Sequence, residues 1–235
     1  MTIEHLSFSS ISKAYQCPKF WKATYLDKLR TPSSEAATWG THYGMVLQSK
    51  LVNKPLTAEE ENGIEADIYE AVEEYFSHPK SWTAADEVEK EINIDPEKWR
   101  WLAEKYGANS ELFWPIMGYM DAVRDGVPMD LKTTKRAGFQ SSWAYQCTLY
   151  ALSQNSRKWE VHSCVRNKTL KYNFYFWHLS DENIRSVMNW ISNGAKKIKS
   201  MVDGINEPEE QTGYWCGFCP VMVDCGVYPF ENLSV

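Results

Sequence analysis

The chain has 235 residues, of which 43% are hydrophobic and 24% are charged, and these proportions exclude a disordered chain. Its formal net charge of -6 excludes a basic surface over the whole molecule, so any binding to nucleic acid must depend on a local positive patch. No stretch has the length and apolar character of a membrane span, and no signal-peptide pattern opens the chain, which predicts a cytoplasmic protein with no membrane partner.

Apolar residues at helical spacing predict helices over much of the chain. Serines precede the first apolar face and are suited to cap it, and Pro18 suits the first turn of a second helix that extends to Leu29. Thr57 and Glu60 form a capping-box pattern ahead of a helix face that begins at Ile64. The predicted helices cover residues 8–16, 18–29, 39–51, 58–76, 96–106, 139–153 and 181–202.

Two stretches combine alternating apolar residues with turn signals, which predicts two β-hairpins. The first turns at Asp125-Gly126, a pair that tolerates the positive φ angles of a tight turn. The second turns at Asn167-Lys168. The order of helices, hairpin, helix, hairpin and helix predicts an α/β fold, a mixed sheet flanked by helices.

Polar side chains on the first hairpin have the chemistry of a cation site. Asp121 lies on its first strand, and Asp130 and Lys132 lie two residues apart on the second, so that the latter two leave the same face. Carboxylates suit Mg²⁺ or Mn²⁺, which polarise a phosphoryl oxygen and lower the pKa of an attacking water, and the Leu131 carbonyl is a further candidate ligand. The alternative is a solvated hairpin, but apolar neighbours such as Met129 favour a central position.

This hairpin resembles the core motif of the PD-(D/E)XK nuclease superfamily, in its RecB-like branch. There a Gly-x-x-Asp strand leads to a second acid one residue before a lysine, a pattern that Asp121, Asp130 and Lys132 match. Gln146 and Tyr150 match the RecB-like Gln-x-x-x-Tyr helix, and their spacing places both on one helix face. The resemblance implies that the hairpin residues are catalytic, with both acids as metal ligands, and that the helix pair positions substrate.

One part of the family pattern is missing. Relatives have Gly-x-x-x-His on a helix before the core, with the histidine as an extra metal ligand, whereas here Gly40 is followed at that offset by Gly44. His42 is nearby, but two positions correspond to about 200° around a helix, so we expect an ordinary surface or capping histidine. Glu89 and Glu91 lie on a strand-like segment, where relatives carry an acid that can approach the metals.

Four of the six cysteines have spacings typical of a metal site. Cys216, Cys219 and Cys225 form Cys-x2-Cys-x5-Cys, and Cys17 is the candidate fourth ligand. Zinc is the first choice from the spacing alone. The one-plus-three split resembles RecB-like nucleases in which a four-iron–four-sulfur cluster joins the chain ends, and this resemblance favours iron–sulfur. The other two cysteines are expected to be small buried residues, Cys147 and Cys164.

The resemblance implies one nuclease domain over residues 1–235, with cluster-binding ends at 1–30 and 205–235 and a nuclease core at 85–180. It implies a Mg²⁺- or Mn²⁺-dependent DNA exonuclease acting on single strands in DNA processing, similar to CRISPR-associated RecB-like exonucleases and their phage relatives, with possible protein partners. The alternatives are a non-catalytic DNA-binding or complex-assembly module and a zinc-stapled structural protein. Local positive charge against phosphates is expected from Lys132, Lys135, Arg136, Lys196, Lys197 and Lys199.

Overall fold

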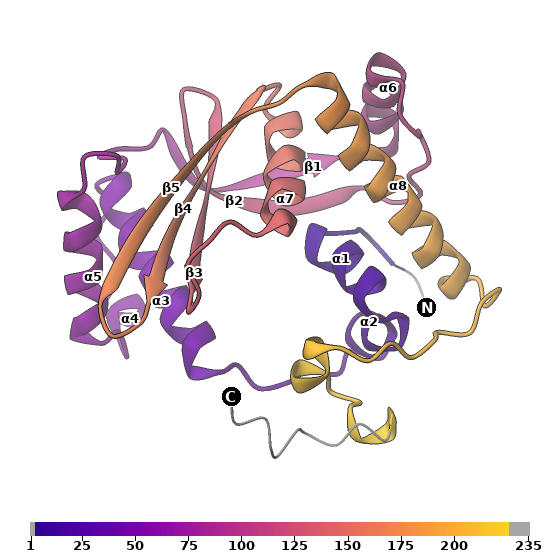
Figure 1. Cartoon of the computed structure of the whole chain (residues 1–235), viewed down its shortest axis with the longest axis horizontal. Coiled ribbons are helices and arrows are strands. Elements are labelled where there is room, and N and C mark those ends of the chain that lie inside the picture. The colour runs from indigo at the N-terminus through magenta and orange to yellow at the C-terminus, as the bar shows by residue number, and fades with distance from the viewer. Residues whose placement is uncertain (1–2, 226–235) are drawn as a thin grey trace. The chain divides into compact units, whose positions relative to one another are not determined.

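The computed structural model describes residues 3–225, which form two compact units (Figure 1). The central unit contains residues 33–92 and 118–184. The terminal unit contains residues 3–32, 93–117 and 185–225. None of the helices in the described part of the chain is both long enough and apolar enough to cross a membrane.

A five-stranded mixed sheet of order β1-β2-β3-β4-β5 organises the fold. Strand β3 pairs antiparallel with β2 and parallel with β4, and β4 pairs antiparallel with β5. The turn between β2 and β3 has φ angles of 52° at Asp125 and 71° at Gly126, as a two-residue hairpin requires. The mixed sheet and both predicted hairpins are therefore confirmed. The strands are β1 (Glu87–Ile94), β2 (Ile116–Arg124), β3 (Val127–Thr134), β4 (Lys158–Arg166) and β5 (Leu170–His178).

Helices cover both faces of the sheet in the central unit. Ala122, Met129 and Cys164 join a buried cluster with residues of α3 and α5 on one face. Because side chains alternate along a strand, the neighbours of these residues point to the other face, where α7 packs on β3 and β4. The helices of this unit are α3 (Glu35–Leu51), α4 (Ala58–Glu61), α5 (Ala66–Ser77) and α7 (Ser141–Ser153).

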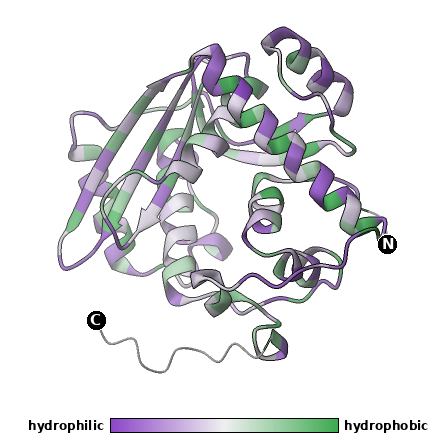
Figure 2. Cartoon of the chain, turned by 45° about the vertical axis from the view of Figure 1, so that its right-hand side comes forward, coloured by the Kyte–Doolittle hydropathy of each residue, from purple (hydrophilic) through white to green (hydrophobic). Residues whose placement is uncertain are grey.

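The terminal unit is mainly helical. Most of α8 belongs to it, and Figure 2 shows hydrophobic and hydrophilic residues alternating along this helix. The buried side of α8 contacts its neighbours closely: a Cβ at Gly194 would lie 2.5 Å from Ile11, and Trp99 Nε1 donates a hydrogen bond to Ser192 Oγ at 3.0 Å. The helices are α1 (Phe8–Gln16), α2 (Pro18–Tyr25), α6 (Pro96–Tyr106) and α8 (Asp181–Val202), with short 3-10 helices η1 (Tyr214–Phe218) and η2 (Val223–Cys225).

Four predicted helix boundaries were wrong. Helix α3 starts at Glu35, four residues earlier than predicted, because the Ser34 side chain caps it by accepting a hydrogen bond from Ala37 N. Helix α2 ends at Tyr25 because Lys28 takes a φ of 58°, and Leu29 is 43% exposed beyond it. The helix expected after the capping box is split into α4 and α5, because Gly63 takes a φ of 86° between them. Helix α7 starts at Ser141, two residues later than predicted, after a loop in which Gly138 has a φ of 118°. Side-chain apolarity alone does not reveal these left-handed turns.

Candidate active site

The hairpin of β2 and β3 brings two carboxylates and a lysine together. Ala122 pairs with Met129, so Asp121 lies opposite Asp130 on the neighbouring strand and both leave the same face. Asp130 is only 2% exposed, and its Oδ2 atom lies 2.7 Å from Lys132 Nζ. Asp121 Oδ2 accepts a hydrogen bond of 2.5 Å from the Leu131 backbone N–H. Asp121, Asp130 and Lys132 therefore share one small polar centre, to which Leu131 contributes its backbone N–H.

The electrostatics of this centre reflect two acids that lie close together, with Asp130 buried and Asp121 half-buried. Burial, followed by the neighbouring Asp130 carboxylate, raises the pKa of Asp121. Burial also raises the pKa of Asp130, although Lys132 opposes that shift. For Lys132, burial lowers the pKa, but the Asp130 carboxylate and then Asp121 outweigh it, so that the net pKa is raised and the lysine is charged. Two acids thus share one lysine, and the pKa of Asp121 is raised to about 8, so that Asp121 holds a proton near neutral pH.

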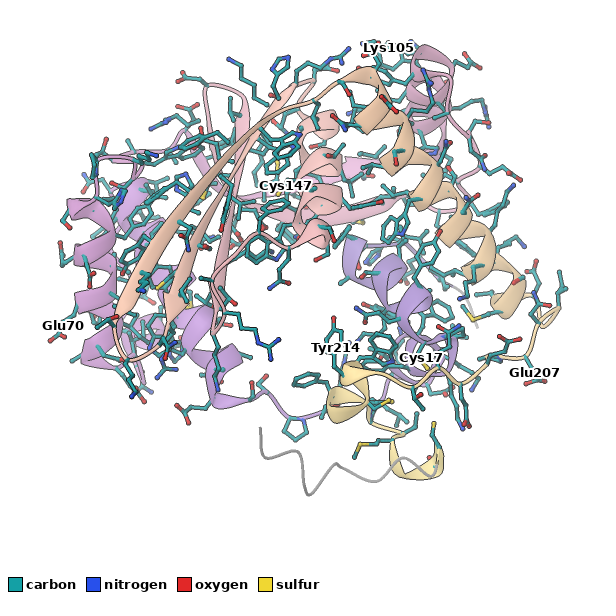
Figure 3. All side chains as sticks on the ribbon, viewed as in Figure 1. Cys17, Glu70, Lys105, Cys147, Glu207 and Tyr214 are labelled. Carbon is teal, nitrogen blue, oxygen red and sulfur yellow. The ribbon has the colours of Figure 1, made fainter. Side chains whose placement is uncertain are left out.

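Helix α7 extends the polar centre through side-chain hydrogen bonds. Lys132 Nζ donates to Gln146 Oε1 at 3.1 Å, and Gln146 Nε2 donates to the Tyr150 hydroxyl at 2.6 Å. Gln and Tyr four residues apart share a helix face, which lets the pair act as one unit. Cys147 on the same helix is 1% exposed, and Figure 3 shows it beside the strands. Burial raises the pKa of its thiol, so it packs as a neutral hydrophobic residue, as predicted.

Sequence reasoning missed Gln48 on α3. Its Nε2 atom donates to Glu89 Oε1 at 2.7 Å and to the Asp121 backbone carbonyl at 3.1 Å. The side chain is only 7% exposed, so these hydrogen bonds satisfy a buried amide. Glu89 itself has a φ of 48° within β1, a left-handed conformation that is rare for a strand residue and that often occurs at functional sites. Gly40, Gly44 and Gln48 follow one another at intervals of four residues. This spacing could have shown that Gln48 shares a helix face with the two glycines.

The two glycines of α3 occupy different environments. A Cβ at Gly40 would clash with Thr133 Oγ1, so the absence of a side chain lets α3 approach β3. A Cβ at Gly44 would meet no atom of residues 3–225 within 4 Å, so within the described chain the position at which relatives carry histidine is open. Helix α3 is continuous from Glu35 to Leu51, and helix geometry therefore directs His42 away from the Gly40 face.

In the terminal unit, the four predicted cysteine ligands line one pocket. Cys17, Cys216, Cys219 and Cys225 surround it together with the apolar side chains of Phe20 and Met222. Backbone N–H groups contact two of the sulfurs: Phe20 N donates to Cys17 Sγ and Gly213 N donates to Cys216 Sγ, both at 3.4 Å. In Figure 3, Cys17 lies beside the segment that carries Tyr214. Four sulfur atoms therefore line one pocket, a donor type that metal-binding sites use, and burial raises the pKa of the Cys219 and Cys225 thiols.

Neither set of ligands is arranged for a metal ion as the side chains stand. Across residues 3–225, no three His, Cys, Asp or Glu side chains have the geometry to hold one ion. The carboxylate centre nevertheless fits a divalent cation, because Asp130 Oδ2 is buried and receives no hydrogen bond of normal geometry within the described part of the chain. A divalent cation would take the place of the proton that Asp121 retains and would pair with both carboxylates.

Comparisons with known proteins agree with this fold. The sequence model of the PD-(D/E)XK nuclease superfamily matches residues 5–226. A crystal structure described as a candidate exonuclease from Eubacterium rectale has a TM-score of 0.60 at 13% identity, covering 88% of this chain and 84% of that one. The structure of a protein named SSO0001 has a TM-score of 0.53 at 13% identity, covering 97% of this chain and 88% of that one. A search of curated proteins finds no match.

The mixed sheet of this chain holds two acids and a lysine on one hairpin. The chain belongs to the PD-(D/E)XK nuclease superfamily, whose model spans nearly its whole length. Members of this family are hydrolytic nucleases that use divalent metals such as Mg²⁺ or Mn²⁺. The two structural neighbours share less than 25% identity with the chain and support the fold alone.

Proposed function

We propose that the chain is a Mg²⁺- or Mn²⁺-dependent deoxyribonuclease of the RecB-like branch, with its catalytic centre on the β2–β3 hairpin. The observation that carries the proposal is the convergence of Asp121, Asp130 and Lys132 on one face of the sheet, joined to Gln146. Asp130 is buried and Asp121 is half-buried, whereas the acids of a solvated surface hairpin would both be exposed.

Each residue has a role in phosphodiester hydrolysis. Asp121 and Asp130 would hold the cation, with the Leu131 carbonyl as a further candidate ligand. When bound, that cation polarises the phosphoryl oxygen and lowers the pKa of an attacking water. Lys132 orients the water and stabilises charge that develops on the phosphate. Gln146 fixes the lysine through its amide oxygen, and Tyr150 fixes the Gln146 amide in turn.

Two further residues organise the acidic side of the centre. Glu89 contributes to raising the pKa of Asp121, so its charge acts on the same centre. Gln48 holds the Glu89 carboxylate and the Asp121 carbonyl at once. In this proposal Gln48 is a positioning residue on the helix that, in relatives, supplies the histidine.

Single-stranded DNA is the proposed substrate, and digestion from an end is the proposed mode. Lys135 and Arg136 follow β3 directly and are exposed near the catalytic strand, where they supply local positive charge within a chain of net charge -6. The structural neighbour from Eubacterium rectale is described as a candidate exonuclease, which is consistent with this mode.

An iron–sulfur cluster is the proposed structural cofactor of the terminal unit. The convergence of Cys17, Cys216, Cys219 and Cys225 on one pocket supports it, as do the N–H donors to two of the sulfurs. The cluster would join segments 1–30 and 205–235, of which residues 1–2 and 226–235 lie outside the described residues, and residues 85–180 would contain the nuclease core of a single functional domain. Anaerobic purification should give a brown protein that absorbs visible light, whereas a colourless protein with stoichiometric zinc would contradict the cluster.

The nuclease proposal is tested by incubating end-labelled single-stranded and duplex DNA with purified protein and Mn²⁺. The wild type should degrade the single strand faster, and EDTA should stop the reaction. Asp130→Asn should lose activity, and Asp125→Asn is its matched control. Asp125 lies at the turn of the same hairpin, away from the centre, and Asn tolerates its φ of 52°. Asp125→Asn should retain full activity. DNA binding without cleavage would overturn the proposal in favour of a non-catalytic module. In that case the lack of a histidine at Gly44 would be the feature that marks the lost activity.

A further inference from the structure

A cavity of about 200 Å³ lies at the turn of the β4–β5 hairpin in the central unit. The charged side chains that line it are all lysines: Lys135 comes from the loop after β3, and Lys168 and Lys171 come from the hairpin. Asn167 and Thr169 add an amide and a hydroxyl. No Asp or Glu lines the cavity within the described chain, which gives it a positive potential although the protein as a whole is acidic.

The lysines of this cavity lack counter-charges inside the protein. Among residues 3–225, none of the three ammonium groups forms an ion pair, and all three residues are exposed. Many other lysines do pair with acids: Lys19, Lys22, Lys50, Lys90, Lys132, Lys196 and Lys199. Three like charges around one cavity repel one another, and an anion in the cavity removes that repulsion.

The strand register connects this cavity to the catalytic face. Thr134 pairs with Val165, which in turn pairs with Lys171, so the Lys171 side chain leaves the same sheet face as Lys132 and Asp130. Lys171 lies two strands away from Lys132 in the sheet and is offset from it by two residues along the strand direction. The usual spacings between strands and between residues then place their Cα atoms about 12 Å apart. A nucleic-acid strand that reaches the catalytic centre therefore needs only a few more nucleotides to reach the cavity.

We propose that the cavity formed by Lys135, Lys168 and Lys171 binds a backbone phosphate of single-stranded DNA a few nucleotides from the bond that is cut. This site rests on the proposed function and deepens it by assigning a second point of contact with the substrate. Lysines suit a phosphate as point charges, and the Asn167 amide is already oriented, because Lys168 N donates to Asn167 Oδ1 at 2.9 Å. The contact carries no sequence information, so it favours long strands of any sequence.

The test is a length-dependent binding assay by fluorescence anisotropy in EDTA, which prevents metal-dependent cleavage. The probes are labelled oligothymidylates of about 3 nucleotides, shorter than the sites that single-strand grooves cover, and of about 12 nucleotides, within that range. The triple variant K135Q/K168Q/K171Q should bind the long probe at least ~10-fold more weakly, and the slope of log K against log salt should become shallower by about 0.7 for each phosphate that the variant no longer binds. Binding of the short probe should weaken far less, because of the three lysines only Lys135 lies next to the catalytic strand.

The matched control is K54Q/K80Q, which removes two exposed lysines of the same unit outside the cavity. Its binding and its salt slope should stay within about twofold of wild type, since neither lysine lines the cavity. Equal losses for the long and short probes, or a triple variant that binds like the control, would overturn the cavity proposal. The cleavage assay tests the proposed function separately. If the wild type cuts DNA but the triple variant still binds the long probe as tightly as wild type does, the cavity proposal alone is refuted. If the wild type does not cut DNA, the nuclease proposal is refuted, and the anisotropy result still tests whether the cavity binds phosphate.

Discussion

Two glycines on α3 should respond to alanine with opposite signs, although they lie one helical turn apart. Replacing glycine by alanine inside a helix stabilises it by about 1 kcal/mol, through the lower backbone entropy of the unfolded chain. At Gly44 the new methyl group meets no atom of the described residues within 4 Å, so Gly44→Ala should raise the free energy of unfolding by about 0.5–1 kcal/mol. At Gly40 the methyl group clashes with Thr133 Oγ1, and overpacking costs about 1–3 kcal/mol.

Gly40→Ala should therefore be about 1–3 kcal/mol less stable than Gly44→Ala. Urea unfolding of the full chain, followed by tryptophan fluorescence, measures the difference. Thr133→Ala removes the clashing oxygen and should rescue Gly40→Ala in a double-mutant cycle, whereas Thr133→Val keeps the bulk and should not. Equal stability of the two alanine variants, or rescue by Thr133→Val, would show that α3 does not approach β3 as described.

Three further predictions concern the polar networks. Gln146→Leu removes a hydrogen bond to a charged lysine, worth about 1.5–3 kcal/mol, and should slow DNA cleavage about 10- to 100-fold without unfolding the protein. In EDTA, the raised pKa of Asp121 means that the folded state holds a proton that the unfolded state has lost. The free energy of unfolding should therefore fall as the pH rises above about 4. The Asp121→Asn variant should show a flatter pH profile, and added Mn²⁺ should oppose the fall in stability. Burial lowers the pKa of His162, which bridges Tyr75 and Glu160. The free energy of unfolding should therefore also fall as the pH drops below about 6.5. A His162→Gln variant whose stability falls equally steeply in this pH range would contradict this role.

Much of the central unit could be predicted because its signals are local. The Asp125-Gly126 turn fixes the hairpin register, and that register alone places Asp121 opposite Asp130. The two-residue spacing of Asp130 and Lys132 then fixes their common face, and their ion pair follows. Nothing beyond strand geometry and turn chemistry was needed.

The contacts that sequence reasoning missed are long-range. Gln48 reaches Glu89 and Asp121 across 41 and 73 positions, and no local pattern marks an isolated glutamine as the partner of a strand carbonyl. The φ of 48° at Glu89 is a backbone property that its side chain does not reveal. The lysine cavity was missed for a similar reason, because its lining comes from two loops that meet only after β3 and β4 pair in parallel.

The central claim is that Asp130 and Lys132 act as one catalytic unit on the hairpin. Single-turnover cleavage of labelled single-stranded DNA with Mn²⁺, measured for Asp130→Asn, Lys132→Gln and the double variant, tests it most directly. Because residues that act as a unit are strongly non-additive, each single variant should lose at least ~100-fold and the double variant should lose little more. A wild-type rate in Asp130→Asn, or losses that multiply in the double variant, would contradict the claim.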